Sequence, residues 1–509
     1  MPIVADLAAD LHALTVELTA LEAAGGPLWV QALTPTSVTG GAYEVAFAVS
    51  YGKLTVTYWA AHGSACWRVE CYHFWGDRLE LDVSRRLGGE HGRLIIAPLS
   101  APASTMKAAP DATQWRQFVR NWLPRLLPPG ALVKRVRQRP GPVVGWQASH
   151  TDATWLILTT SHPDELAVRQ LLGQALQALG MLPTATCLCL VLPPGAFTQA
   201  APFLSLLTLP QLRLYEATAD WSSLRQAAVG HQLPLVTEPI RRWQHIPPTE
   251  AELDELRTWF GDALASHCEV VPVGTSILSV RWYGLACARL RRATPESRSP
   301  ALRFGLTTLG EPERPLTSRN RADFQALLAA LARYRSPAAR EVHHPLYRAH
   351  PERWLDVVIR RNLPVVDDAL EPAHIWGQSP HFGRDAVGLA DFVTLTRGGQ
   401  LAVVELKAVA DPDLIWQGLT YWLHAVHHWR QGDFVRRGYF TTAQLDRRAL
   451  PRLYLIAPTL RFHPVVRAVA RRLNQTVPLT LIGINERWRR SLRVAFREDF
   501  GPVDSKSPE

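Results

Sequence analysis

The spacing of apolar residues along the chain first predicts a helix and then a set of strands. Leucines recur every three or four positions between Leu7 and Leu21, which is typical of an amphipathic helix over residues 1–24. Residues 42–98 instead alternate apolar and polar positions between turn signals, which predicts a β-meander. The strands are expected at 43–50, 53–60, 66–72, 78–83 and 93–98. The N-terminal region is therefore predicted to be a helix followed by a β-rich module.

Helical and strand patterns then alternate, which indicates a parallel α/β layer. The expected elements are helices at 115–127, 163–179 and 197–207 and strands at 155–160, 185–192 and 212–216. No glycine-rich phosphate loop follows any of these strands, so we expect no nucleotide pocket. No internal repeat is evident in the sequence.

Residues 247–340 show a mixed pattern before the last domain. Helices are predicted at 250–265 and 322–335, with strands near 268–274, 278–290 and 302–308. We therefore expect a multidomain α/β protein. The predicted domains are 1–105 (helix and β-rich module), 106–246 (α/β), 247–340 (mixed α+β connecting region) and 341–500.

Composition narrows the class of protein. The net charge is +10, which favours a polyanionic partner. No run of about 18 apolar residues occurs, so no membrane span is expected, and the first 24 residues lack the pattern of a secretory signal. The six cysteines form no CxxC pair. Buried reduced thiols, and hence a cytoplasmic protein, are the expectation.

The C-terminal domain contains ionisable residues inside an apolar hairpin pattern. Residues 387–396 and 400–407 read as strands, joined at Arg397-Gly398-Gly399. They contain Asp391, Glu405 and Lys407, and buried charges are costly unless they are paired or bound to a metal. Only five lysines occur in the chain, so a lysine in a buried strand is notable.

The length of the turn decides whether the three groups share one face. A two-residue turn would place Asp391 opposite Leu406, on the other face. A three-residue turn, Arg397 to Gly399, places Asp391 opposite Glu405, with side chains about 5 Å apart between Cβ atoms. Because three-residue hairpin loops need a left-handed residue and glycine is present, we predict the three-residue register.

Such a face is suited to a hard divalent cation. Two carboxylates and the Leu406 carbonyl make part of an octahedral set for Mg²⁺ or Mn²⁺. A bound cation polarises a phosphate and lowers the pKa of its water. Lys407 could hold that water, and an ammonium, unlike a guanidinium, can lose its proton there.

These residues resemble the PD-(D/E)XK (restriction-endonuclease-like) nuclease superfamily, within it the RecB-like branch. Gly388-x-x-Asp391, Glu405-x-Lys407 and Gln417-x-x-x-Tyr421 match its three motifs in order and spacing. Ala390 stands where the name-giving pattern has proline. The resemblance covers about 150 residues, implies a mixed-sheet α/β nuclease core over 341–500, and implies Mg²⁺- or Mn²⁺-dependent hydrolysis of DNA phosphodiesters.

The resemblance also implies roles for residues on two helices. Glu352, in the helix before the hairpin, would be a further catalytic and metal-binding acid, although the helix dipole alone favours a glutamate there. Gln417 and Tyr421 would position substrate or the lysine. Their helix is predicted to start at Asp411-Pro412, and its polar stripe also contains His424 and His428.

The residues after this helix are rich in arginine. Between Arg430 and Arg497 fifteen arginines stand against three acids, which favours contact with a phosphate backbone. The candidate nucleic-acid-binding residues are Arg436, Arg437, Arg487, Arg489 and Arg490.

The prediction is thus a metal-dependent DNA endonuclease that acts in DNA repair or in defence against foreign DNA. The alternative is an inactive nuclease-fold module that binds DNA or a protein partner. A third interpretation, a structural protein with a surface Glu–Lys pair, requires Asp391 and Glu405 on opposite faces. Homodimerisation stays open, as does binding of substrate or a partner by the N-terminal region.

Overall fold

The computed structural model contains two compact units. One comprises residues 1–110 with 218–223, and the other comprises 111–217 with 224–509. The described residues are 7–25, 28–33, 38–50, 53–60, 63–74, 78–84, 91–98, 112–136, 143–151, 153–218, 221–228, 246–273, 275–293, 300–377 and 390–501. Within them lie four sheets that are mixed or antiparallel, and each sheet is accompanied by helices.

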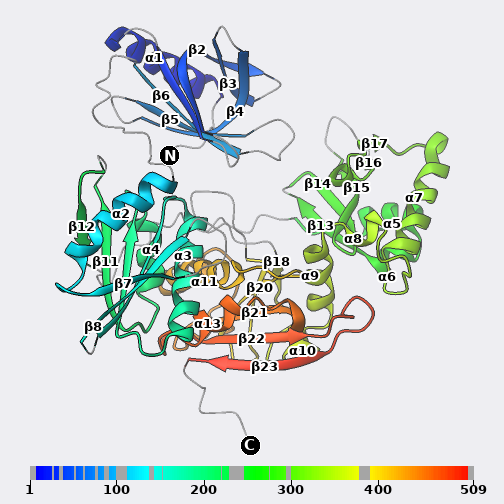
Figure 1. Cartoon of the computed structure of the whole chain (residues 1–509). Helices are drawn as coiled ribbons and strands as arrows, with labels where there is room; N and C mark the ends of the chain where they lie inside the picture. The colour runs from blue at the N-terminus through cyan, green and yellow to red at the C-terminus, as the bar shows by residue number, and fades with distance from the viewer. Residues whose placement is uncertain are drawn as a thin grey trace, which may run out of the picture. The chain divides into compact units, whose positions relative to one another are not determined.

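The first unit is a closed six-stranded antiparallel barrel with one helix (Figure 1). Leucines of α1 (Leu7–Gly25) share a core with apolar residues of the strands, and Tyr72 donates a hydrogen bond to Asp10 of α1 at 2.7 Å. The strands are β1 (Leu28–Leu33), β2 (Val38–Ser50), β3 (Lys53–Ala60), β4 (Gly63–Phe74), β5 (Leu79–Ser84) and β6 (His91–Pro98). The predicted helix and meander are confirmed, and β1 closes the sheet.

The second unit begins with an α/β sheet that we call the middle core (residues 112–217 and 224–227). Its strands run in chain order, antiparallel at both edges and parallel at the centre. The elements are α2 (Ala112–Leu126), β7 (Leu132–Val136), β8 (Val143–His150), β9 (Ala153–Thr160), α3 (Glu165–Met181), β10 (Cys187–Leu192), α4 (Phe197–Leu204), β11 (Gln211–Ala217) and β12 (Leu224–Ala227). The predicted parallel layer is present, with β7, β8 and β12 as additions.

The connecting region is an antiparallel five-stranded sheet with flanking helices. It comprises α5 (Glu250–Phe260), α6 (Ala263–His267), β13 (Cys268–Val273), β14 (Ile277–Trp282), β15 (Leu285–Arg291), β16 (Ala301–Phe304), β17 (Arg314–Pro315) and α7 (Arg321–Tyr334). The single strand predicted over 278–290 is wrong. Tyr283 and Gly284, both at positive φ, form a tight turn that splits it into β14 and β15.

A second six-stranded sheet forms what we call the C-terminal core (residues 351–501). Helix α8 (Pro345–Arg348) leads into it. Its elements are α9 (Pro351–Arg361), α10 (Leu363–Val366), β18 (Trp376–Gly377), β19 (Phe392–Leu395), β20 (Leu401–Leu406), α11 (Leu414–Gln431), α12 (Asp433–Arg436), β21 (Arg452–Pro458), α13 (Pro464–Ala470), β22 (Leu479–Ile484) and β23 (Val494–Phe500). Residues 378–389, which include the motif glycine Gly388, lie outside the described part.

Two apolar clusters hold the second unit together. One joins α3 and α4 of the middle core to α11, α13 and one face of the C-terminal sheet. The other joins α9 and the opposite face of that sheet to the connecting region. The six cysteines lie in the described part of the chain and form no disulfide there. Cys187, Cys189, Cys268 and Cys287 are buried as predicted, whereas Cys66 is exposed. Among the described helices, none has the length and apolar character needed to cross a membrane.

A buried arginine fastens the connecting region to the segment that leads into the C-terminal core. Arg335, fully buried, donates to the carbonyl oxygens of Trp282, Tyr283, Leu346 and Ala349 at 2.7–3.1 Å. Burial lowers the pKa of this guanidinium to about 9. Four carbonyl dipoles thus replace a carboxylate partner.

Candidate active site

The hairpin of β19 and β20 has the predicted three-residue register. Phe392 pairs with Val404 and Leu395 with Leu401, and Thr396 N donates to Gln400 O at 2.8 Å. Arg397 to Gly399 therefore form the turn, with Gly399 at φ +84°. One further step of this register sets Asp391 opposite Glu405. The interpretation that requires these two acids on opposite faces is wrong.

Asp391 is held by the backbone of the neighbouring strand. Its Oδ2 accepts a hydrogen bond from Leu406 N at 2.7 Å. Since the N–H and C=O of one strand residue point to the same side, the Leu406 carbonyl also faces the β19 side. Asp391 and this carbonyl thus lie at one end of the hairpin, as the predicted ligand set requires.

Glu405 is the most deeply buried acid of the site. Only 4% of its side chain is exposed, and its Oε1 lies 3.5 Å from Lys407 Nζ. Its Oε2 is buried and accepts no hydrogen bond from any described residue. A buried carboxylate oxygen without a donor is costly, and a cation at this position would offset that cost.

Lys407 lies among three carboxylates. Its Nζ is 3.5 Å from Glu405 Oε1, 3.9 Å from Glu352 Oε2 and 4.0 Å from Asp411 Oδ2. Its backbone N–H donates to Ile456 O of β21 at 3.0 Å, which fixes the end of the strand. The structure therefore brings Glu352, predicted from resemblance, to the lysine. It adds Asp411, which the sequence analysis assigned only to a helix start.

Burial and mutual repulsion shift the titration of these groups. Burial raises the pKa of Asp391 to about 7, and the Asp356 charge acts in the same direction. Burial and then the Asp391 charge raise the pKa of Glu405 well above its ordinary value. For Lys407, burial lowers the pKa, but Glu405, Glu352, Asp391 and Asp411 together outweigh it and raise the pKa. Shifts of this kind are common at catalytic sites.

Asp356 is an acid that the sequence analysis missed. It lies on α9 one turn after Glu352, and both of its oxygens bind Arg360, at 2.9 and 2.8 Å. Arg360 also binds Glu269 of the connecting region at 2.9 Å. The i, i+4 spacing of Asp356 and Arg360 was visible in the sequence, but the position of this pair beside Asp391 depends on the fold.

Helix α11 brings Tyr421 close to the two acids and Gln417 close to Asp413. Burial, followed by the charges of Glu405 and Asp391, raises the pKa of the Tyr421 phenol. Gln417 donates its backbone N–H to Asp413 O at 2.9 Å, and its side chain lies beside the Asp413 carboxylate. The helix begins at Leu414 rather than at Asp411-Pro412, because Asp411 accepts from Asp413 N in a turn before it. Of the two histidines, His428 binds Asp433 at 2.8 Å.

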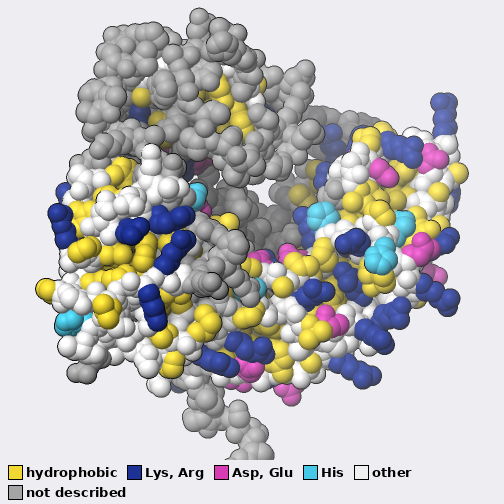
Figure 2. Space-filling model, in the orientation of Figure 1, with side chains coloured by type: hydrophobic (Ala, Val, Ile, Leu, Met, Phe, Trp, Pro, Cys, Tyr) yellow, Lys and Arg dark blue, Asp and Glu magenta, His cyan; other side chains and the backbone are white. Residues whose placement is uncertain are grey.

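The predicted nucleic-acid-binding arginines differ in exposure. Arg436, Arg487 and Arg490 are exposed, and Arg437 is partly buried. Arg489 stacks on the rings of Tyr347, Trp354 and Trp488 with its guanidinium carbon 4.3–5.1 Å from their centroids. On the face seen in Figure 2, basic side chains are spread over several elements of the second unit. Arg489 therefore has a packing role among these rings.

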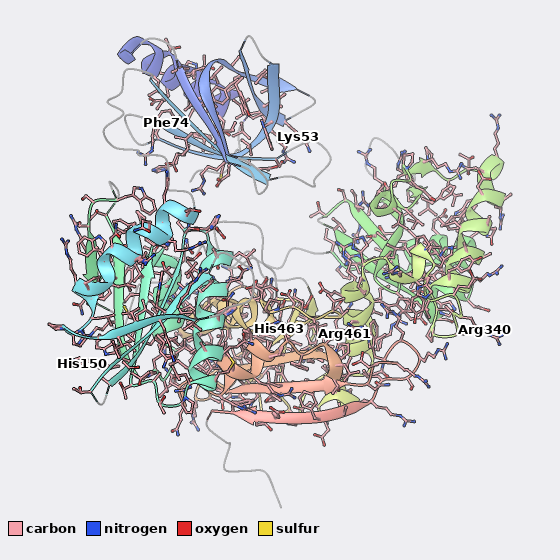
Figure 3. All side chains as sticks on the ribbon, viewed as in Figure 1. Lys53, Phe74, His150, Arg340, Arg461 and His463 are labelled. Carbon is pink, nitrogen blue, oxygen red and sulfur yellow. The ribbon has the colours of Figure 1, made fainter. Side chains whose placement is uncertain are left out.

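A hollow of about 990 Å³ adjoins the site between α3 and α13. Asp411, whose Oδ2 lies 4.0 Å from Lys407 Nζ, lines this hollow together with Asp413 and Trp416, and Arg471 and Arg472 are also in its wall. His463, at the start of α13, lines it too and is labelled in Figure 3. Its lining thus combines apolar side chains with arginines and two aspartates.

The residues present fit a divalent cation bound by few protein ligands. Among the described residues, no three His, Cys, Asp or Glu side chains converge into a complete metal cage. Asp391 and Glu405 supply two carboxylates, and Mg²⁺ commonly keeps several waters beside one or two of them. The unpartnered Glu405 Oε2 is the observation that favours a cation there.

Comparisons with known proteins give little guidance. No family model matches the sequence, and no curated protein matches it. A solved structure titled "Structure of EndoMS-dsDNA2 complex" is similar at 14% identity over 40% of this chain and 93% of that chain, with a TM-score of 0.16. A similarity this weak supports no argument about fold or chemistry.

Proposed function

We propose that the C-terminal core is a Mg²⁺- or Mn²⁺-dependent nuclease of the PD-(D/E)XK type, RecB-like branch, that hydrolyses DNA phosphodiester bonds. The observation that carries the proposal is the pairing of Asp391 with Glu405 at the end of one hairpin, with Lys407 Nζ 3.5 Å from Glu405. The order of the three sequence motifs supports the family, and the arginine-lined hollow beside Asp411 supports a polyanionic substrate.

Each residue has a role that its position allows. Asp391, Glu405 and the Leu406 carbonyl would hold the cation. Glu352, whose carboxylate lies 3.9 Å from Lys407 Nζ, would assist them. When bound, the cation would supply charge stabilisation at the phosphate and a more acidic water. Lys407 would orient the attacking water and exchange a proton with it, since metal binding to its carboxylate neighbours removes the charges that raise its pKa.

The reaction consumes one water for each bond cut. The water oxygen forms a new bond to phosphorus, one P–O ester bond breaks, and the departing oxygen takes up a proton. One product end is a phosphate monoester and the other a hydroxyl. Tyr421, close to both acids, would orient the substrate or Lys407. Gln417 would act through Asp413.

The test is cleavage of single-stranded, duplex and branched DNA by the full chain with Mg²⁺, Mn²⁺ or EDTA. We expect cleavage of at least one substrate with either metal and none with EDTA. Asp391→Ala and Lys407→Ala should abolish it while the circular dichroism spectrum stays unchanged. Lys134→Ala is the matched control, because Lys134 is an exposed lysine on β7 and should leave cleavage unaffected.

Wild-type rates for Lys407→Ala would refute its role. Tight DNA binding without cleavage under any metal would instead favour a binding module built on the same fold.

A further inference from the structure

The middle core and the C-terminal core have the same sheet. In both, six strands lie in chain order, and in both the successive pairs are antiparallel, antiparallel, parallel, parallel and antiparallel. In both, one helix crosses from the third to the fourth strand (α3 and α11) and another from the fourth to the fifth (α4 and α13).

The helices also cover corresponding faces. The helix before the first strand, α2 or α9, packs on one face. Trp115 of α2 donates to Thr159 at 2.9 Å, and Trp354 of α9 shares a core with Val404 and Leu406. The crossover helices pack on the opposite face in both cores, within one shared apolar cluster. Figure 1 shows α3 beside α11 and α13, where these two helix layers meet.

The two cores meet through equivalent segments in a reciprocal manner. Leu207 follows the last residue of α4 (Leu204) by three positions, and Leu473 follows the last residue of α13 (Ala470) by three positions. These two leucines form an antiparallel bridge. Thr208 N donates to Arg472 O at 2.6 Å, and Asn474 N donates to Leu206 O at 2.8 Å. Exchanging the two cores converts each of these hydrogen bonds into the other, as at a two-fold interface.

The helix contacts repeat this reciprocity. Phe203 of α4 packs edge-on against Trp416 of α11, with centroids 5.2 Å apart. In the equivalent contact between the other two helices, Val465 of α13 lies 3.0 Å from the position that a Cβ of Gly173 on α3 would occupy. Arg169 of α3 donates to Thr420 of α11 at 3.0 Å. The interface thus has approximate two-fold symmetry within one chain.

The middle core lacks a counterpart of the acidic pair, Asp391 and Glu405. Thr160, at the end of β9 on the face that packs against α3, corresponds to Glu405, and its partner Val143 corresponds to Asp391. The position of Lys407 then falls on His162. No residue of β8 or β9 is acidic in any alternative register.

We propose that the middle core is a second copy of the C-terminal core without a metal site. The chain is then an internal pseudodimer with one hydrolytic centre, which cuts one strand of a duplex per encounter. This inference rests on the proposed function for its cleavage chemistry. One centre consumes one water and breaks one P–O bond in one strand, and the opposite strand stays intact.

The first test follows supercoiled plasmid DNA treated with limiting full-length protein and Mg²⁺ or Mn²⁺. We expect the open-circular form to accumulate to nearly all of the plasmid before linear DNA appears, at every protein concentration. Linear DNA that forms together with the first loss of supercoiled DNA would overturn the inference, because two centres would then act in one encounter.

The second test counts tight Mn²⁺ binding to the full chain without DNA, by electron paramagnetic resonance. Glu405→Gln should remove all tight binding, whereas Thr160→Val, its counterpart in the middle core, should leave both binding and nicking unchanged. Tight Mn²⁺ that survives in Glu405→Gln and disappears in Thr160→Val would overturn the inference.

The two proposals fail in different ways. Loss of all tight Mn²⁺ in Glu405→Gln, without cleavage of any DNA by the wild type, contradicts the nuclease proposal while supporting a single metal centre per chain. Cleavage of both strands in one step supports a nuclease and contradicts the pseudodimer with one centre.

Discussion

Asp391 and Glu405, the acidic pair, share one buried end of a hairpin. Ionising both of them without a cation is therefore costly. Asp391 and Glu405 lie opposite each other, and Glu405 Oε2 has no hydrogen-bond donor among the described residues. Lys407 brings one positive charge to this place, which offsets only part of the repulsion. The site should therefore gain stability from a divalent cation and lose stability as its acids ionise without one.

Asp391→Asn should stabilise the metal-free protein at high pH. The raised pKa of about 7 means that the folded state binds this proton more tightly than the unfolded state. The contribution of the bound proton to the free energy of unfolding is then fully present below pH ~4, the ordinary aspartate range. It is lost as the pH rises through about 7. In EDTA we expect equal stabilities near pH 4 and a gain on the order of 2–4 kcal/mol at pH 8. Denaturant unfolding at both pH values measures it.

Asp368→Asn is the control for this measurement, since Asp368 is an exposed aspartate of the same core. It should follow the wild type at both pH values. Saturating Mn²⁺ should reverse the order, because the wild type then gains a bound cation that Asp391→Asn binds poorly. Parallel pH profiles for Asp391→Asn and the wild type would contradict the argument.

The shared position of Asp391, Glu405 and Lys407 could be predicted because local rules determine it. Alternation places Glu405 and Lys407 on one face, and the glycine turn brings Asp391 to them. Neighbours that come from distant segments could not be predicted this way. The electrostatic influence of Asp356 on Asp391 depends on how α9 crosses the sheet. Arg489 was expected to contact phosphate, but three aromatic rings from α8, α9 and its own loop surround it.

At the scale of elements, the turn that joins β19 to β20 determines the geometry of the site. Gly399 has φ +84°, and a Cβ there would lie 2.6 Å from Gln444 O. Its neighbour Gly398 has no positive φ, and a Cβ there would lie 3.7 Å from Thr396 Oγ1. The two adjacent glycines thus offer a matched pair of substitutions.

Gly399→Ala should destabilise the protein by about 2 kcal/mol or more, since the left-handed conformation costs an alanine roughly 1–2 kcal/mol and the backbone contact adds to it. Gly398→Ala should change stability by less than about 0.5 kcal/mol. Because the turn sets the register, Gly399→Ala should also weaken Mn²⁺ binding. Denaturant unfolding and Mn²⁺ titration of both variants test this, and equal losses in the two would refute a special role for Gly399.

Long, regular elements were predictable, whereas edges and repeats were not. The central strands β9, β10, β20, β21 and β22 have strong apolar runs. The edge strands β7, β12 and β18 are short or mostly exposed, and β23 only alternates partly buried and exposed residues. The shared topology of the two six-stranded sheets could not be predicted either, because many different apolar sequences can form one topology. Trp115 and Trp354 match in role, but sequence alone gives no reason to align them.

On the scale of the whole molecule, shared cores decide which parts unfold together. The middle and C-terminal cores bury α3, α4, α11 and α13 in one apolar cluster, and α9 shares another with the connecting region. The barrel has a separate cluster with α1. A chain built this way should not unfold in a single two-state transition.

Calorimetry of the full chain should therefore show the barrel and the second unit as separate transitions. Leu81→Ala removes a fully buried side chain from the barrel core, and Leu190→Ala removes one from the cluster shared by the two related cores. Each should cost about 2–5 kcal/mol in its own unit. Leu81→Ala should lower only the transition assigned to the barrel.

Leu190→Ala should lower the transition of the second unit as a whole, although Leu190 lies far in sequence from the acidic pair. The temperature at which Mn²⁺ is released from Asp391 and Glu405 should fall with it. The reason is that α11 and α13 lose their packing partner when the middle core unfolds. If instead Leu190→Ala melted the middle core alone and left metal binding at its wild-type temperature, the shared cluster would not couple the two cores. The pseudodimer would then be two independently stable domains in contact.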